Sequence, residues 1–137
     1  MGMFYHNGLG VLEDAVEASK WYRLAAEQGD AISQFYLGFF YGNGLGLEQD
    51  SEEASKWYFK AASQGVMEAQ YNLATMYQNG VGVIQNYEKA FEWHLKAAEQ
   101  GMLGSQVNVG IMYENSIGTK KDISKAMEWY LICLLYT

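Results

Sequence analysis

Small and apolar residues recur with the spacing of one helix face, most clearly between residues 50 and 65. There they fall at positions i, i+3, i+4, i+7 and i+8, while lysine and glutamate occupy other positions. The residues of this stripe are Ala54, Trp57, Tyr58, Ala61 and Ala62. The pattern predicts an amphipathic helix that buries the stripe.

Both ends of this helix have local signals. Asp50 can cap the N-terminus, with Glu53 three residues later as in a capping box, and Asp14 with Glu17 repeats that arrangement. Gly65 can adopt the left-handed conformation that ends a helix. The sequence therefore predicts that helices begin after Asp14 and Asp50.

The same pattern occurs four times at a strict period of 36 residues, with tyrosine, glycine and alanine also at fixed phases. The four tryptophans are Trp21, Trp57, Trp93 and Trp129. Asn86 and Asp122 hold the cap position in the last two copies, where lysine replaces the glutamate of the capping box, so we expect weaker caps there. A period of this length predicts a stacked array of structural repeats.

Another helical pattern lies between these stripes and runs, in one copy, from residue 31 to residue 42. It is the first helix of each repeat, and the helix with the stripe is the second. Leu37 and Tyr41 share one side of it with Gly38, whose small size would let the paired helix approach closely. The glycine-rich segment from residue 42 to residue 49 predicts a turn, because glycine adopts positive φ without steric cost. Asn-Gly pairs also suggest hairpins, but no alternating apolar run flanks them, so we expect no strand.

Composition agrees with an ordered chain and limits its partners. Half of the residues are hydrophobic, proline is absent, and no apolar run is long enough to span a bilayer. Nine basic and sixteen acidic side chains give a net charge of −7. This balance disfavours nucleic acid, which needs a basic footprint, and favours a partner with a basic surface.

In the third copy the recurring residues read Leu73-Ala74-x-x-Tyr77-x-x-Gly80-x-Gly82-Val83, then Lys89-Ala90-x-x-Trp93, then Ala97-Ala98-Glu99-Gln100-Gly101. This pattern resembles the Sel-1-like repeat, a relative of the tetratricopeptide repeat, over nearly the whole chain. Three residues depart from it: His94 replaces tyrosine, Ser116 replaces glycine and Cys133 replaces alanine. We therefore expect the turn at Ser116 to differ in shape.

The resemblance implies an all-α protein, a right-handed α/α superhelical solenoid of 36-residue helix-turn-helix repeats. It would form a single array over residues 1–137, with a partial unit 1–29 and full units 30–65, 66–101 and 102–137. It also implies a bacterial adaptor that binds other proteins on an extended concave surface.

By analogy with tetratricopeptide geometry, the concave surface is lined by first-helix residues beside the buried stripe, which vary between units while packing positions recur. These residues are Phe35, Phe39, Asn43, Tyr71, Thr75, Gln78, Asn79, Val107, Ile111 and Glu114. We expect this groove to hold a protein or peptide. In the alternative interpretation, Phe35, Tyr71 and Val107 belong to the core between repeats.

An enzyme would need a nucleophile, a base or a metal set converging on one point. The chain offers His6, His94 and Cys133, and packing explains the last two because they stand at positions of recurring tyrosine and alanine. Gly-x-Gly elements such as residues 44–46 follow a helix and lack a P-loop lysine. We expect no catalytic residue, no metal site and no cofactor, and we expect Cys133 to be reduced.

A second functional interpretation is an inhibitor or immunity protein that blocks a toxin or hydrolase, a role that the resemblance also implies. Only the acidic balance points to it. No signal-peptide pattern opens the chain, so as written it would be cytoplasmic. Met1 lies at the phase of Leu37, inside a first helix, and a longer precursor would allow a periplasmic or secreted location.

The last predicted helix ends in apolar residues where the other copies are mostly polar. These residues are Ile132, Leu135 and Tyr136, and Thr137 follows at the phase of Gly65. Solenoid ends are normally polar, and an apolar patch on a terminal helix usually marks a contact. Either a further unit has been cut away or the helix docks on another copy. We predict a weak homodimer through these three residues, two-fold because a head-to-tail stack would not close.

Overall fold

The structure, a computed structural model, describes residues 8–136, with side chains from residue 14 onward. The expectations placed on Met1, His6 and Thr137 lie outside these residues. Within the described range the chain forms seven α-helices and no strand. It divides into two compact units, Met1–Val66 and Met67–Thr137.

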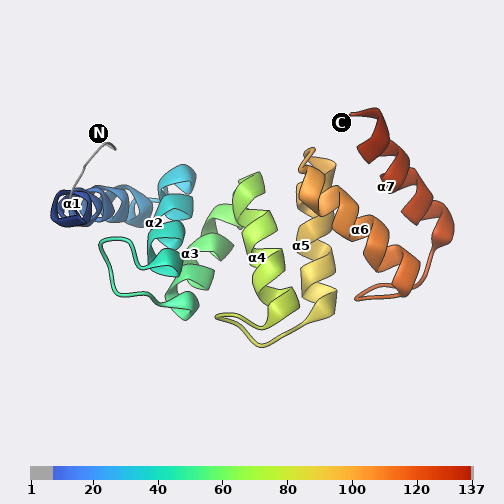
Figure 1. The fold of residues 1–137 in the computed structure, drawn as a ribbon, viewed down its shortest axis with the longest axis horizontal. Helices are drawn as coiled ribbons and strands as arrows, with labels where there is room; N and C mark the ends of the chain where they lie inside the picture. Colours follow the sequence, from blue (N-terminus) through green and yellow to red (C-terminus); the bar gives the residue numbers. More distant parts are fainter. Residues whose placement is uncertain (1–7, 137) are drawn as a thin grey trace. The chain divides into compact units, whose positions relative to one another are not determined.

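Helix-turn-helix pairs make up both units (Figure 1). The helices of the first unit are α1 (Gly8–Glu27), α2 (Ala31–Asn43) and α3 (Ser51–Ser63). Those of the second are α4 (Met67–Asn79), α5 (Tyr87–Glu99), α6 (Leu103–Asn115) and α7 (Ile123–Leu135). Inside each unit every helix packs against its neighbour in sequence. The predicted first helix, residues 31–42, is confirmed to within one residue.

The predicted N-caps are confirmed in three helices. The side chains of Asp50, Asn86 and Asp122 each accept a hydrogen bond from the backbone N–H three residues later, at 3.0 Å. Gly65 has a φ of +97°, the left-handed conformation predicted beyond the end of α3. Local signals therefore define the starts of α3, α5 and α7.

The predicted N-cap at Asp14 is wrong, because α1 runs unbroken from Gly8 through this residue. In the next repeat the glycine turn is held against the preceding helix, and a Cβ on Gly46 would lie 2.4 Å from the backbone of Ala15. Within the described residues no helix precedes α1 to hold residues 8–13 in that way. Their leucines and glutamate favour helix, so the helix continues through the capping residue.

The expected difference in the turn at Ser116 is also wrong. Ser116 has φ 56° and ψ 46°, close to the 65° and 40° of Gly44 at the equivalent helix end. The hydrogen bond from the next backbone N–H to the helix is 2.9 Å long in both turns. A left-handed serine costs about 1–2 kcal/mol, and the packing around the turn outweighs that cost.

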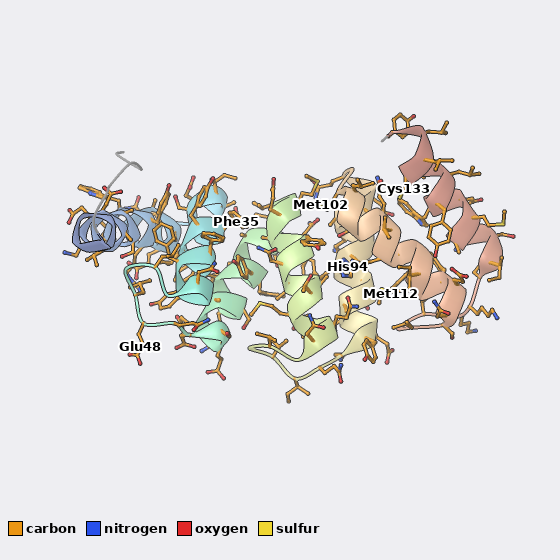
Figure 2. The ribbon with its side chains drawn as sticks, in the orientation of Figure 1. Phe35, Glu48, His94, Met102, Met112 and Cys133 are labelled. Atoms are coloured by element: carbon orange, nitrogen blue, oxygen red, sulfur yellow. The ribbon has the colours of Figure 1, made fainter. Side chains whose placement is uncertain are left out.

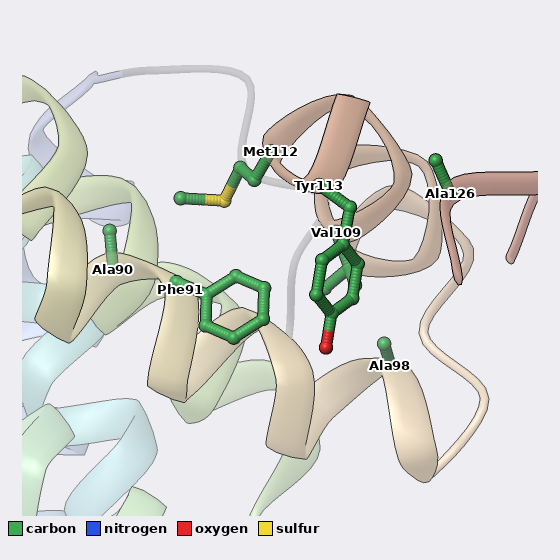
Figure 3. Packing of buried hydrophobic residues seen from close by; sticks show 7 residues of the cluster. All are labelled: Ala90, Phe91, Ala98, Val109, Met112, Tyr113 and Ala126. Carbon is green, nitrogen blue, oxygen red and sulfur yellow. The ribbon is translucent and has the colours of Figure 1, made fainter. Parts of the chain in front are cut away.

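The predicted stripes form the core of each unit. All five stripe residues of α3 are buried, and Leu37 and Trp57 pack together with Ala26 in the first unit. In the second unit the rings of Phe91 and Tyr113 meet edge to face, with centroids 5.1 Å apart (Figure 3). The residues of that cluster are Ala90, Phe91, Ala98, Val109, Met112, Tyr113 and Ala126. Burial of these faces is the main source of stability.

Within two of the helix pairs, a tyrosine ring of the second helix packs directly over a glycine of the first. A Cβ added to Gly38 would lie 2.9 Å from Cδ1 of Tyr58. A Cβ added to Gly110 would lie only 2.5 Å from Cε1 of Tyr130. The glycine predicted to permit close approach therefore does so because a ring occupies the space of its missing side chain.

In the α4–α5 pair different residues stand at these two positions. His94 stands at the tyrosine position and Ala74 at the glycine position, and both are buried. The imidazole is shorter than a phenol, so it leaves room for the methyl group of Ala74. The prediction that His94 is a packing substitute is confirmed. The change from tyrosine to His94 is accompanied by a change from glycine to Ala74.

We predict that His94→Tyr destabilises the fold by about 1–3 kcal/mol, the usual cost of overpacking, because the larger ring would meet Ala74. Adding Ala74→Gly should recover part of this loss, since it recreates the pair formed by Gly38 and Tyr58. Urea unfolding of the wild type, both single variants and the double variant measures the coupling. If His94→Tyr lowered the free energy of unfolding equally with and without Ala74→Gly, the two positions would not be coupled and the hypothesis of a matched change would be contradicted.

Candidate functional site

In the first unit the predicted groove residues lie along α2. Phe35 lies on α2 (Figure 2) and is half-buried. Its ring centroid is 5.8 Å from that of Tyr58. Phe39, one turn later, is 39% exposed. The side-chain amide of Asn43 donates to the backbone oxygen of Phe39 at 2.9 Å, which completes the helix end. Of these three residues, Phe39 offers the most apolar surface to a partner.

In the second unit the groove residues of α4 are mostly engaged by their neighbours. The ring of Tyr71 is half-buried and lies 5.7 Å from the ring of His94. Thr75 donates from Oγ1 to the backbone oxygen of Tyr71 at 3.0 Å. Gln78 Oε1 lies 3.3 Å from Nε2 of His94. Of these four residues, only Asn79 is exposed.

On α6 the predicted residues expose more apolar surface. Val107 and Ile111, one turn apart, are 38% and 39% exposed. Glu114 accepts a hydrogen bond of 2.7 Å from the hydroxyl of Tyr130, and this bond raises the pKa of Tyr130 to about 12. This stretch of α6 therefore combines two accessible aliphatic side chains with a fixed carboxylate.

None of the ten predicted groove residues is fully buried, and their role in binding stays a prediction. Phe35 and Tyr71 contact rings of the second helix in their own repeats, and Val107 is exposed, so the alternative interpretation also stays a prediction. Sequence reasoning missed Ile32 and Tyr36, which are exposed on α2. Their spacing of i, i+4 beside the buried stripe was the available signal.

His94 is the most unusual ionisable side chain among those described. It is 0% exposed, and its Nδ1 lies 3.0 Å from Oγ of Ser105, also fully buried. Desolvation lowers the pKa of His94 from 6.5 to about 4. The imidazole is therefore neutral at physiological pH, and its burial leaves no route for a substrate to reach it. Sequence reasoning missed Ser105, because nothing local marks it as the partner of a residue on another helix.

Other candidate chemistry is sparse in the described part of the chain. Cys133, expected on the packed face, is half-buried. Among the side chains from residue 14 onward, no group of three or more His, Cys, Asp or Glu residues could hold a metal ion. None of the described helices combines the length and the apolar character needed to cross a membrane.

The end of α7 exposes a large apolar surface, as its sequence suggests. Leu135 and Tyr136 are strongly exposed, Ile132 is half-buried, and Leu131 and Leu134 are exposed beside them. Ile132 and Tyr136 also line a hollow of about 490 Å³ together with residues of the turn before α6. This end of the second unit is thus both apolar and concave.

The repeats defined by this geometry match a known sequence family. The profile of the Sel1 repeat matches residues 1–30, 31–66, 68–102 and 104–132. The chain belongs to the Sel1 repeat family. Sel1 repeat proteins generally act as scaffolds for protein–protein interaction and are typically not catalysts. The predicted resemblance to this family is confirmed.

Solved structures share the fold. A Sel1 repeat protein from Oxalobacter formigenes has a TM-score of 0.83 and 38% identity, covering 87% of this chain and 49% of that one. The protective antigen c5321 of uropathogenic Escherichia coli strains, which displays an SLR fold, has a TM-score of 0.84 and 39% identity, covering 88% of this chain and 26% of that one. The cysteine rich protein B of Helicobacter pylori has a TM-score of 0.68 and 18% identity, covering 91% and 90%.

These similarities confirm the predicted fold class, an all-α solenoid of helix-turn-helix repeats, and agree with a bacterial origin. The chain spans about half the length of the Oxalobacter protein and about a quarter of c5321. A search of curated proteins found no match.

We predict that His94 makes the fold less stable in acid. The unfolded state binds a proton near pH 6.5 and the folded state only near pH 4, so the free energy of unfolding should fall as pH drops through this window, by about 3 kcal/mol at most. Above pH 6.5 this contribution is fully present.

Urea unfolding between pH 4 and pH 8 measures the effect. The Ala74→Gly/His94→Tyr double variant is the matched control, because it keeps a ring at this position but removes the titrating group. The stability of the wild type should depend more steeply on pH than that of the control between pH 4 and pH 6.5. Parallel pH profiles would show that His94 is not the cause.

Proposed function

We propose that this chain is a non-catalytic scaffold that binds a protein or peptide through the first-helix faces of its Sel1 repeats. The observation that carries the proposal is a recurring exposed apolar position. Phe39 on α2 and Ile111 on α6 stand at the same repeat phase, and each is 39% exposed. Recurrence in both units distinguishes these residues from isolated apolar side chains, which are common on protein surfaces.

The surroundings make these side chains suitable anchors. Phe35 precedes Phe39 by one turn, and Val107 precedes Ile111 by one turn, so each unit presents a pair of apolar residues at i and i+4. Each helix is fixed by its buried stripe on the opposite side. Binding to such a preorganised surface loses less conformational entropy than binding to a mobile loop.

We infer that the partner carries basic residues. The chain has a net charge of −7, and Glu114 lies one turn from Ile111 on α6. Opposite charge around an apolar contact raises the rate of association and improves selectivity, and both effects weaken as salt screens the charges. A peptide that combines an aromatic or aliphatic anchor with lysine or arginine fits this surface.

We predict that Phe39→Ala and Ile111→Ala each weaken binding of peptides selected on the wild-type chain from a random display library. The expected loss is roughly tenfold or more, because a few buried anchors carry most of the free energy of an interface. Tyr71→Ala should act in the same direction. Isothermal titration calorimetry of the selected peptides at two salt concentrations measures both the anchors and the charge.

Phe59→Ala and Ile84→Ala are the controls, since both residues are exposed but lie outside the first helices. These two variants should bind the selected peptides with the affinity of the wild-type chain. Unchanged affinity of the folded triple variant at Phe39, Tyr71 and Ile111 would exclude the first-helix faces as the site.

We also propose weak two-fold self-association through Ile132, Leu135 and Tyr136. These side chains lie at the exposed end of α7. Their burial would contribute about 1.5–3 kcal/mol each before the costs of association. An isologous contact is favoured because it closes after two copies.

We predict that the apparent mass in light scattering rises with concentration for the wild type and not for Leu135→Glu. Ile84→Glu adds the same charge at another exposed apolar residue and should associate like the wild type. A wild-type chain that stays monomeric at millimolar concentration would leave the α7 surface without this role.

A further inference from the structure

A glutamine at the end of a second helix ties that helix to the first helix of the same repeat. At the end of α3, Gln64 donates from Nε2 to Oε1 of Gln34 at 2.8 Å and to the backbone oxygen of Gly29 at 3.0 Å. At the end of α5, Gln100 donates from Nε2 to Oε1 of Gln70 at 2.8 Å. One primary amide therefore satisfies acceptors on the first helix and on the turn that precedes it.

At the end of α7 the acceptor is present but the glutamine is not. Gln106 stands at the position of Gln34, and the Nε2 atoms of both donate to a backbone oxygen of the preceding helix at 3.2 Å. This shared bond holds both side-chain amides in the same orientation. Tyr136 occupies the position of Gln64, and its side chain is 83% exposed, so it does not replace the missing donor.

Gln106 is left with a poor partner. Its side chain is mostly buried, at 8% residue exposure. Among the described residues, the hydrogen-bond donor that reaches Gln106 Oε1 is the thiol of Cys133, with Sγ 3.9 Å away. A thiol is a weak donor, and a buried amide oxygen normally accepts a stronger hydrogen bond.

The space beside Gln106 is open. The hollow of about 490 Å³ is lined by Gln106 and by Gly101, which stands at the position of Gly29. Its other wall includes Trp129, Ile132 and Tyr136. In the two preceding repeats a lysine ammonium lies over the equivalent tryptophan, as Lys60 does over Trp57 at 4.5 Å. Ile132 stands at that lysine position, so the wall is apolar here.

We propose that this hollow is a binding site for a primary-amide side chain, a glutamine presented by a partner peptide. Its Nε2 would donate to Oε1 of Gln106 and to the backbone oxygen of Gly101, as Gln64 donates to Gln34 and Gly29. The methylenes of the ligand would pack on Trp129 and Ile132. The site lies at the turn before α6 and the end of α7 (Figure 1), and it does not depend on the first-helix faces.

The chemistry of the lining selects the amide over charged side chains. A carboxylate would place a negative oxygen against two acceptors, and Glu99, which also lines the hollow, would repel it. An ammonium can donate, but it would lose hydration beside the apolar wall that Ile132 creates. A neutral amide supplies the donors without either cost.

The probe is the pentapeptide acetyl-AAEQG-amide, which carries the chain's own residues 97–101, together with versions in which glutamate or lysine replaces its glutamine. We expect the glutamine peptide to shift the side-chain amide resonances of Gln106 and the indole resonance of Trp129 in nitrogen-15 NMR spectra. It should bind roughly tenfold or more tightly than either charged version, because the carboxylate leaves the buried acceptor unpaired and the ammonium loses its hydration.

Tyr136→Gln should abolish the response, because the new side chain fills the hollow from within, and it should raise the melting temperature. Leu131→Gln is the matched control: it introduces the same residue at another exposed position of α7 and should keep the response. Gln106→Met, which removes the acceptor at similar volume, should also abolish it. Titrations at two protein concentrations separate peptide binding from self-association through α7.

Equal binding of the glutamine and glutamate peptides, or equal binding of the lysine peptide, would overturn the assignment. So would an unchanged response in Tyr136→Gln, or no shift of Gln106 up to the solubility limit of the peptide. None of these outcomes bears on the first-helix faces, which are tested with different residues.

Discussion

The contact between a second-helix ring and a small first-helix residue controls how closely the paired helices approach. Tyr58 over Gly38 and Tyr130 over Gly110 leave no room for even one added carbon. Because the rings are rigid and buried or half-buried, the helix separation is set by the sum of two side-chain sizes. At the same two positions His94 and Ala74 are both buried, so a smaller ring is combined there with a larger first-helix residue. The stripes, turns and terminal hydrogen bonds of each pair all require this separation.

A frame fixed in this way leaves its outward side chains free to vary. The same repeat phase holds Phe39, Thr75 and Ile111, which differ in shape and polarity although the helices beneath them are alike. Function in a Sel1 repeat chain therefore depends on side chains that the fold does not constrain. The scaffold role common to the family follows from the frame, and in our proposal the choice of partner follows from residues such as Phe39 and Ile111.

Much of the fold could be predicted because its signals are local. The α3 stripe, the caps at Asp50, Asn86 and Asp122 and the left-handed Gly65 each depend on residues a few positions apart. The N-cap predicted at Asp14 was wrong because a capping residue starts a helix only where packing keeps the preceding segment from being helical. The different turn expected at Ser116 was wrong because the turn imposes its left-handed conformation on any residue that it tolerates. The candidate groove was placed by analogy, and sequence alone did not show that Thr75 and Gln78 are already engaged.

Two departures from the repeat pattern, His94 in place of tyrosine and Tyr136 in place of glutamine, are visible in the sequence. Their structural consequences are not. Replacing tyrosine by His94 is compensated inside the molecule: Ala74 adds a methyl group at the glycine position, and Ser105 and Gln78 lie within hydrogen-bond distance of the two ring nitrogens. Replacing glutamine by Tyr136 is not compensated, since Gln106 keeps its orientation and the space beside it stays open. In the sequence both changes are departures from the repeat pattern. They are distinguished only in the structure, where the presence or absence of a partner for the neighbouring side chain becomes visible. A compensated change contributes to the fold, whereas an uncompensated one leaves hydrogen-bonding capacity that another molecule can use.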